Sequence, residues 1–197
     1  MTAPVLYFVR HGQTDWNAEG RLQGQRDTDL NAEGLAQAGE AARRLQAVAG
    51  DGLREADFVA SPLNRTRRTM EGLRTALDLP PDGYRLDPRL KEIGFGDWEG
   101  STWAEIRRRD GARATARDRD RWGYRPPGEG GESYAMLVER VAPALADLRG
   151  PTVMVAHGGI ARAILVARGH LSPYQAPRIG IRQGGVLVLD ESGWRWA

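Results

Sequence analysis

Two stretches of the chain join an apolar strand pattern to residues that could do chemistry. The apolar run at residues 5–9 is followed directly by Arg10 and His11, and a second apolar run is followed by His157 and Gly158. Side chains at the carboxyl ends of buried parallel strands face the crevice where α/β proteins bind ligands. If the two strands are neighbours, both imidazoles lie at one edge of the sheet.

A third stretch adds a further cation. Ser61, as the expected N-cap, and Pro62, as the first helical residue, follow a short strand pattern and open a helical one, with Arg65 in its first turn. A helix start offers free N–H groups and the positive end of the helix dipole to an oxyanion. Together with Arg10 and the two histidines, this arrangement predicts phosphate binding. The alternatives are a metal site, or one buried and one catalytically idle histidine. The neighbouring arginine and glycines make poor ligands for a divalent cation.

Composition limits the other classes of function. The 197 residues are 41% hydrophobic and 27% charged, as in an ordinary globular protein, and the formal net charge is only +2. We therefore expect neither a nucleic-acid nor a membrane partner. The absence of cysteine excludes disulfides, thiolate catalysis and cysteine-ligated zinc. With no signal-peptide pattern, a cytoplasmic location is expected.

Strand and helix patterns alternate along the chain. We expect strands at residues 5–9, 57–60, 84–90, 151–156 and 186–190, and helices at 31–48, 61–77, 101–109, 133–148 and 159–168. This alternation predicts an α/β fold with a mostly parallel central sheet and helices on both faces, a three-layer α/β/α sandwich. We expect one domain, 1–197, with an irregular substrate-covering insert around 101–132.

Four segments resemble the histidine phosphatase superfamily, which includes cofactor-dependent phosphoglycerate mutases and many small phosphatases. They are VRHGQTDWN at 9–17, SPLNRTRRT at 61–69, LKEIGFGDWEG at 90–100 and VAHGG at 155–159. The match spans nearly the whole chain in the family's order. It implies a phosphoglycerate mutase-like fold and a phosphohistidine mechanism that requires no metal.

The resemblance also implies roles for particular residues. His11 would be the nucleophile, and Glu92 would protonate the leaving oxygen and then deprotonate water. Sequence chemistry alone does not choose among Glu92, Asp97 and Glu99, which share one glycine-rich stretch; the family pattern selects Glu92. The residues expected to bind the phosphoryl group or the substrate are Arg10, Asn17, Gln23, Gly24, Arg65, His157 and Gly158.

The sequence predicts only the general class of the substrate and of the molecule that accepts the phosphoryl group. We expect a phosphomonoesterase acting on a small phosphorylated metabolite, because the chain is short and lacks a clear paired-arginine motif for a mutase. The alternative is a cofactor-dependent phosphoglycerate mutase, which alone would need a 2,3-bisphosphoglycerate primer; a non-catalytic binding module is a third. The candidate lid residues are Trp122, Tyr124 and Arg125. Trp194 and Trp196 either close the core or form the contact of a homodimer.

Overall fold

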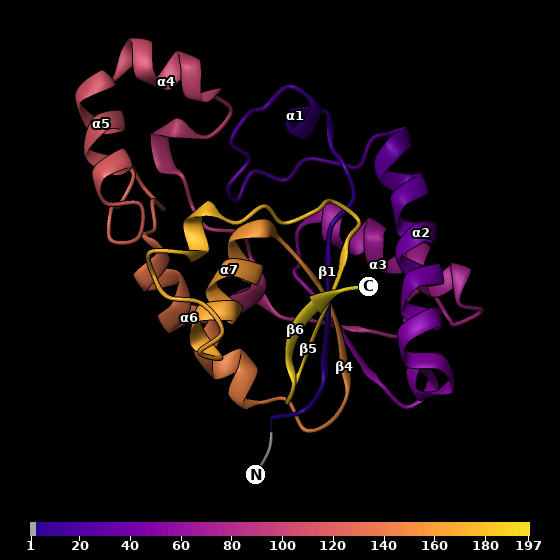
Figure 1. Ribbon diagram of the computed structural model, residues 1–197. Coiled ribbons are helices and arrows are strands. Elements are labelled where there is room, and N and C mark those ends of the chain that lie inside the picture. Colours follow the sequence, from indigo (N-terminus) through magenta and orange to yellow (C-terminus); the bar gives the residue numbers. More distant parts are fainter. Residues whose placement is uncertain (1–2) are drawn as a thin grey trace.

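A computed structural model of the chain describes residues 3–197 as a three-layer α/β arrangement (Figure 1). The first two residues of the expected 1–197 domain lie outside this range. The strands in the described part are β1 (Leu6–Arg10), β2 (Asp57–Ala60), β3 (Arg85–Leu86), β4 (Thr152–Ala156), β5 (Val186–Asp190) and β6 (Gly193–Trp196). They form one sheet in the order β3-β2-β4-β1-β5-β6.

The sheet is mostly parallel, which confirms the predicted fold class. Strands β3, β2, β4 and β1 pair in parallel, whereas β5 is antiparallel to β1 and β6 antiparallel to β5. The central strand β4 is buried at all five positions, as expected for a strand covered on both faces. Strand β6, which carries Trp194 and Trp196, was not predicted from the sequence.

Helices cover both faces of the sheet. In chain order they are α1 (Asp15–Ala18), α2 (Ala32–Ala49), α3 (Asn64–Ala76), α4 (Trp103–Arg109), α5 (Gly111–Arg119), α6 (Tyr134–Ala146) and α7 (Gly158–Ala167). Helices α2 and α3 lie on one side of the sheet and α6 and α7 on the other (Figure 1). Each side has its own core, with Leu45, Met70 and Leu73 in one and Leu137 and Ile160 in the other.

Side-chain caps mark the starts of the long helices α2 and α6. The side chain of Asn31 accepts the N–H of Gly34 at the start of α2, and the side chain of Ser133 accepts the N–H of Met136 at the start of α6. The predicted strand at 84–90 is only two residues long and is followed by a 3₁₀ turn at Pro88–Leu90.

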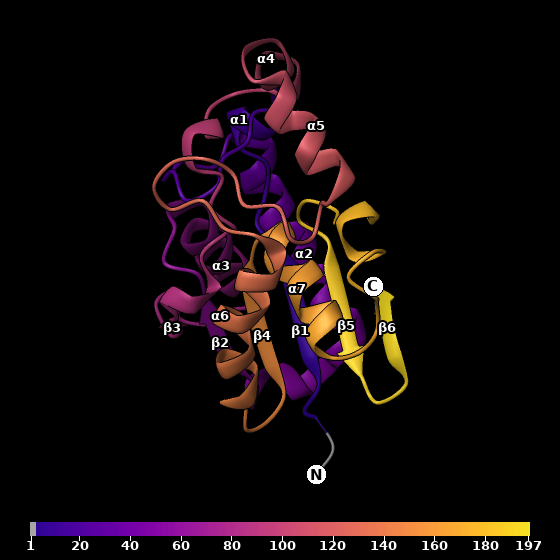
Figure 2. The same ribbon diagram turned by 90° about the vertical axis from the view of Figure 1, so that its left-hand side faces the viewer.

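The helix expected at 101–109 is present as α4, whereas the stretch that follows it in the insert around 101–132, expected to be irregular, is helical as far as Arg119. Helix α4 is capped by Thr102, and the charged stretch that follows it forms helix α5. These helices enclose a small separate core of Trp98, Ile106 and Ala114. They project beyond the carboxyl ends of the strands (Figure 2), which places them over the edge of the sheet that carries the candidate site.

Candidate active site

The pairing of β1 with β4 brings the two predicted histidines together. Arg10 lies opposite Ala156 in the parallel register, and the N–H of His11 donates to the carbonyl of Ala156 at 3.0 Å. The rings of His11 and His157 consequently lie 5.2 Å apart, edge to face. Both side chains are almost completely buried, at 2% and 0% exposure. The expectation that the two strands end side by side is correct.

His11 is held as a neutral imidazole with one free nitrogen. Its Nδ1 lies 2.7 Å from the carbonyl oxygen of Gly12, an acceptor that requires Nδ1 to carry the proton. The unprotonated lone pair is therefore on Nε2. Burial, and then the nearby guanidinium groups of Arg65 and Arg10, lower the pKa of His11 well below its ordinary value of 6.5. At neutral pH the ring is uncharged, as a nucleophile must be.

The loop after β1 passes very close to helix α2. A Cβ added to Gly12 would lie 2.3 Å from the carbonyl oxygen of Gly34, so a larger residue at Gly12 would force the two segments apart. The N–H of Gly12 also donates to the hydroxyl of Thr69 at 3.1 Å. These contacts fix the carbonyl that orients His11.

His157 is oriented by a buried hydroxyl. Its Nε2 lies 2.8 Å from Oγ of Ser61, and its Nδ1 is buried with no hydrogen-bond partner in the described part of the chain. Burial lowers the pKa of His157 well below 6.5, with further contributions from Arg65 and His11. The Ser61 hydroxyl predicted to cap α3 thus contacts His157, and α3 begins at Asn64, two residues after the expected first helical residue Pro62.

Arg10 and Arg65 bring buried positive charge to the same place. Arg10 Nη1 donates to the carbonyl of Ile181 at 2.6 Å, and Arg65 donates to the carbonyls of Arg26 and Gly24 at 2.7 and 2.8 Å. Burial lowers the pKa of each to about 10, against the opposing effect of Glu92. Both guanidinium groups remain charged at neutral pH, and carbonyl acceptors do not neutralise them.

Unpartnered nitrogens in this cluster indicate that an anion binds there. Nε of Arg10, Nε of Arg65 and Nδ1 of His157 are buried without a hydrogen-bond partner among residues 3–197. Buried donors without acceptors are costly and uncommon in folded proteins. An oxyanion such as phosphate, bound beside His11, would supply acceptors to the two guanidinium nitrogens, and to Nδ1 of His157 when that atom carries the proton.

Glu92 is held at the start of helix α7. Its Oε1 accepts the N–H of Gly159 at 3.0 Å and the N–H of Ile93 at 2.9 Å, and Oε2 accepts the N–H of Gly159 at 3.2 Å. A Cβ on Gly159 would lie 2.3 Å from Oε1, so this glycine leaves the room that the carboxyl occupies. The rival carboxylates Asp97 and Glu99 do not line the cavity described next.

An open cavity of about 150 Å³ lies over these groups. Its walls include eight of the nine residues that the sequence assigned to the site; they are Arg10, His11, Asn17, Gln23, Gly24, Arg65, Glu92 and Gly158. The ninth, His157, is fully buried next to His11. Oδ1 of Asn17 accepts from the N–H and the hydroxyl of Thr14, which leaves the NH₂ group of Asn17 to face a ligand.

The cavity also has walls that the sequence did not single out. Arg21 and Arg162 line it, together with Leu22 and Phe95. Arg162 follows Gly158 by four residues on α7, so the helical spacing that places both on one face was the available signal.

The three candidate lid residues lie elsewhere. Trp122 stacks on Tyr134 and Tyr124 stacks on Trp98, each at 5.6 Å between ring centroids. Arg125 donates to the carbonyl of Gly131 at 2.8 Å. None of the three lines the cavity, so their contacts are those of packing residues.

The described residues offer neither a cluster of metal ligands nor a membrane-spanning helix. Across 3–197 there is no group of three or more His, Asp or Glu side chains placed to hold a metal ion. No helix in that range combines the length and the apolar character needed to cross a bilayer.

Comparison with known proteins agrees with the geometry. The family profile for the histidine phosphatase superfamily (branch 1) matches residues 6–197. The glucosyl-3-phosphoglycerate phosphatase of Mycobacterium tuberculosis is 36% identical over 91% of this chain and 82% of its own length. A 2,3-bisphosphoglycerate-dependent phosphoglycerate mutase of Methylobacterium radiotolerans is 33% identical over 93% and 88%. The solved structure of mycobacterial glucosyl-3-phosphoglycerate phosphatase with VO₃ superposes with a TM-score of 0.78 at 34% identity, covering 99% of this chain and 98% of that one.

The fold and the site therefore define an enzyme of the phosphatase and phosphoglycerate mutase type. The chain belongs to the histidine phosphatase superfamily. The family predicted from the four sequence segments and the predicted enzyme class are both confirmed, and the phosphatase relatives support the predicted phosphatase activity.

Proposed function

We propose that this protein hydrolyses a small phosphomonoester through a phosphohistidine formed on Nε2 of His11, without a metal ion. One observation carries the proposal. The neutral His11 ring has its Nδ1 bound to the carbonyl of Gly12 at 2.7 Å, and Arg10, Arg65 and His157, each with a buried unpartnered nitrogen, lie at the same site. A nucleophile and a set of oxyanion donors are thereby assembled in one buried place.

In the first step, Nε2 of His11 attacks phosphorus and the bond from phosphorus to the alcohol oxygen breaks. The carboxyl of Glu92 gives its proton to the departing oxygen. Arg10, Arg65 and His157 bind the equatorial oxygens, where charge stabilisation is the main contribution to phosphoryl transfer. The imidazolium that forms keeps its Nδ1 proton on the carbonyl of Gly12.

In the second step, water attacks the phosphohistidine. The carboxylate of Glu92 takes a proton from that water as the bond between phosphorus and Nε2 breaks, which releases phosphate and restores neutral His11. Glu92 and Asn17 are partly exposed to solvent at the cavity, so water has access to the group that must activate it. One carboxyl therefore serves as acid and then as base.

A mutase would pass the phosphoryl group from His11 to a second position of a phosphoglycerate instead of to water. The mutase relatives keep this alternative open, because the same phosphohistidine serves both reactions. We favour hydrolysis because the chain has phosphatase relatives and because the side chain of Glu92 is partly exposed to solvent. The single-domain organisation over 1–197 and the cytoplasmic location expected from the sequence remain predictions.

The deciding experiment follows phosphate release from a panel of phosphomonoesters without added metal, with 3-phosphoglycerate included and its isomerisation measured in parallel. We expect phosphate release from several esters and little isomerisation. Isomerisation that needs 2,3-bisphosphoglycerate, with negligible phosphate release, would establish the mutase instead. His11→Ala serves as the control for contaminating phosphatases.

A further inference from the structure

The segment that carries Glu92 has no regular secondary structure of its own. It joins the 3₁₀ turn at Pro88–Leu90 to a second 3₁₀ turn at Gly96–Trp98. The hydrogen bonds from Ile93 and Gly159 hold the carboxyl of Glu92, but they do not by themselves fix the backbone from which that side chain extends. The position of Glu92 relative to His11 therefore depends on what binds the backbone of residues 89–94.

Arg140 on helix α6 binds this backbone at three carbonyl groups. Its Nη1 donates to the carbonyl oxygens of Arg89 and Lys91 at 2.7 and 2.9 Å. Its Nη2 donates to the carbonyl oxygen of Glu92 at 3.2 Å. One side chain thus ties the backbone of residues 89–92 to α6, which shares a core with α7 on the same face of the sheet (Figure 1).

Glu132 is the ionic partner of Arg140 and binds the same segment. Its carboxylate accepts Nε and Nη2 of Arg140 at 2.8 and 2.7 Å. Its Oε2 also accepts the N–H of Gly94 at 3.1 Å, and its own N–H donates to the carbonyl of Gly94 at 2.9 Å. The side chains of Arg140 and Glu132 are only 22% and 14% exposed, so salt and solvent screen this ion pair less than a surface pair.

These contacts use the whole guanidinium group of Arg140. Its five hydrogen bonds match the five N–H groups of a guanidinium, with two bonds to Glu132 and three to the backbone carbonyls. A lysine has three donors on a single nitrogen and cannot reproduce this planar arrangement. An arginine bonded in this way holds the segment in one position relative to α6.

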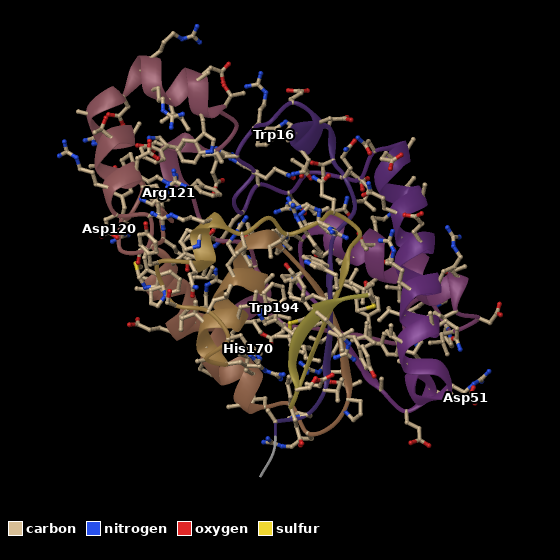
Figure 3. All side chains as sticks on the ribbon, in the orientation of Figure 1. Trp16, Asp51, Asp120, Arg121, His170 and Trp194 are labelled. Atoms are coloured by element: carbon tan, nitrogen blue, oxygen red, sulfur yellow. The ribbon has the colours of Figure 1, made fainter. Side chains whose placement is uncertain are left out.

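Arg140 lies beside the site without being part of it. It does not line the cavity over His11, but its charge is close enough to His157 to contribute to the lowered pKa of that residue. The contact between Glu92 and Gly159 lies at the start of α7. His170, which follows the other end of α7, lies well below the upper ends of the central strands in Figure 3. Arg140 is therefore placed to act on the proton donor through its backbone.

We propose that Arg140, paired with Glu132, is a positioning residue for Glu92, and that it fixes the backbone of residues 89–92 so that the carboxyl reaches the leaving oxygen. The inference rests on the proposed function, because it names a residue that acts through Glu92. A displacement of about 1 Å at a reacting group can lower a rate by about 10²-fold. Loss of Arg140 therefore weakens proton transfer while the residues that bind phosphate keep their places.

The dependence on the leaving group tests this role. In Arg140→Gln we expect kcat/KM to fall by about tenfold or more for alkyl phosphates, and by clearly less for p-nitrophenyl phosphate, whose leaving group needs no proton. Arg140→Lys should restore only part of the loss, because it keeps the charge but fewer of the hydrogen bonds. If Arg140→Gln does not fold, Arg140→Lys carries the same comparison of alkyl and aryl esters.

Arg74→Gln is the matched control. Arg74 lies in the last turn of α3, is 6% exposed, donates from Nε to the carbonyl of Pro80 at 2.7 Å and does not line the cavity. It is likewise a buried helix arginine that holds a loop carbonyl, so its loss also affects stability. The ratio of kcat/KM on alkyl and aryl esters should nevertheless keep its wild-type value in this variant.

A double variant gives the stricter test. A residue that acts only through Glu92 loses its effect when the acid is gone, so Arg140→Gln should cause no further loss on alkyl phosphates in a Glu92→Gln background. A further loss of about tenfold in that background, the effect expected of independent residues, would overturn the inference. Equal losses on alkyl and aryl esters in Arg140→Gln would overturn it as well.

Amide hydrogen exchange separates this inference from the proposed function, because it needs no turnover. The N–H groups of Ile93 and Gly159 both donate to the carboxyl of Glu92, and their exchange reports whether it is in place. Both should exchange about tenfold faster in Arg140→Gln and not in Arg74→Gln. If no ester is hydrolysed but exchange rises in this way, the hydrolase proposal fails and the positioning of Glu92 stands. If esters are hydrolysed and exchange is unchanged, the hydrolase stands and the positioning role fails.

Discussion

Replacing Glu92 with glutamine removes the proposed proton donor with little change of shape. Oε1 makes the two shorter contacts of this side chain, to the N–H groups of Ile93 and Gly159 at 2.9 and 3.0 Å. A glutamine carbonyl oxygen in that place keeps both contacts. The NH₂ group then replaces Oε2, whose contact with Gly159 is the longest of the three, at 3.2 Å. The variant therefore tests proton transfer and not the position of the side chain.

The size of the effect depends on the leaving group. General acid catalysis contributes about 10²- to 10⁴-fold, and an alkoxide leaving group needs the whole of it. A nitrophenolate leaves without a proton. Glu92→Gln should therefore lower kcat/KM for alkyl phosphates by about 10²-fold or more and for p-nitrophenyl phosphate by less than about tenfold. Asp97→Asn, at the exposed rival carboxylate, should change neither.

The second step gives an independent signal. Without the base at Glu92 the phosphohistidine is hydrolysed slowly, so rapid mixing of Glu92→Gln with p-nitrophenyl phosphate should give a burst of nitrophenolate equal to the enzyme concentration. Steady-state and rapid-mixing absorbance measurements provide both results. An equal loss of kcat/KM on alkyl and aryl esters, with no burst, would refute the assignment of Glu92.

Two further predictions concern His157 and Gly159. Because burial lowers the folded-state pKa of His157 below 6.5, the unfolded chain takes up its proton first; stability is therefore present above pH 6.5 and falls as the pH drops below it. His157→Gln should reduce that slope by about 1.4 kcal/mol per pH unit in denaturant titrations, and an unchanged slope would contradict a neutral His157. Gly159→Ala, whose Cβ would lie 2.3 Å from Oε1 of Glu92, should lose activity on alkyl phosphates as Glu92→Gln does. Gly111→Ala, with nothing within 4 Å of the new Cβ, is its helical control, and equal activity in both variants would count against the contact.

The sequence predicted that His11 and His157 lie together because both residues follow the carboxyl ends of neighbouring strands. The two apolar runs pair in parallel, and this pairing brings the two rings together independently of the conformation of the loops that follow. Arg65 lies in the first turn of its helix, as expected, although that helix begins at Asn64 and not at Pro62. Ser61 was read as a cap, and its hydroxyl instead contacts His157, a tertiary contact that no local pattern reveals.

The residues and helices around the centre of the site were predicted less well, because their positions depend on tertiary packing and not on local sequence patterns. Helix α5 buries only Ala114, so its sequence lacks the apolar periodicity of a helix packed on a sheet. Arg162 was missed because it belongs to none of the four family segments, and only its spacing of four residues from Gly158 on α7 indicates that it lines the cavity. Trp122 and Tyr124 were expected at the lid but stack on other aromatic rings, a choice of partner that composition does not reveal.

The central claim is tested most directly by identifying the phosphorylated atom. Glu92→Gln mixed with a phosphomonoester and quenched under basic conditions should carry one phosphoryl group, located by mass spectrometry on the peptide containing His11. Phosphorus–proton correlation spectra should assign it to Nε2, because Nδ1 is bound to the carbonyl of Gly12 at 2.7 Å. Phosphate on Nδ1, on another residue, or on no residue while turnover continues would contradict the mechanism.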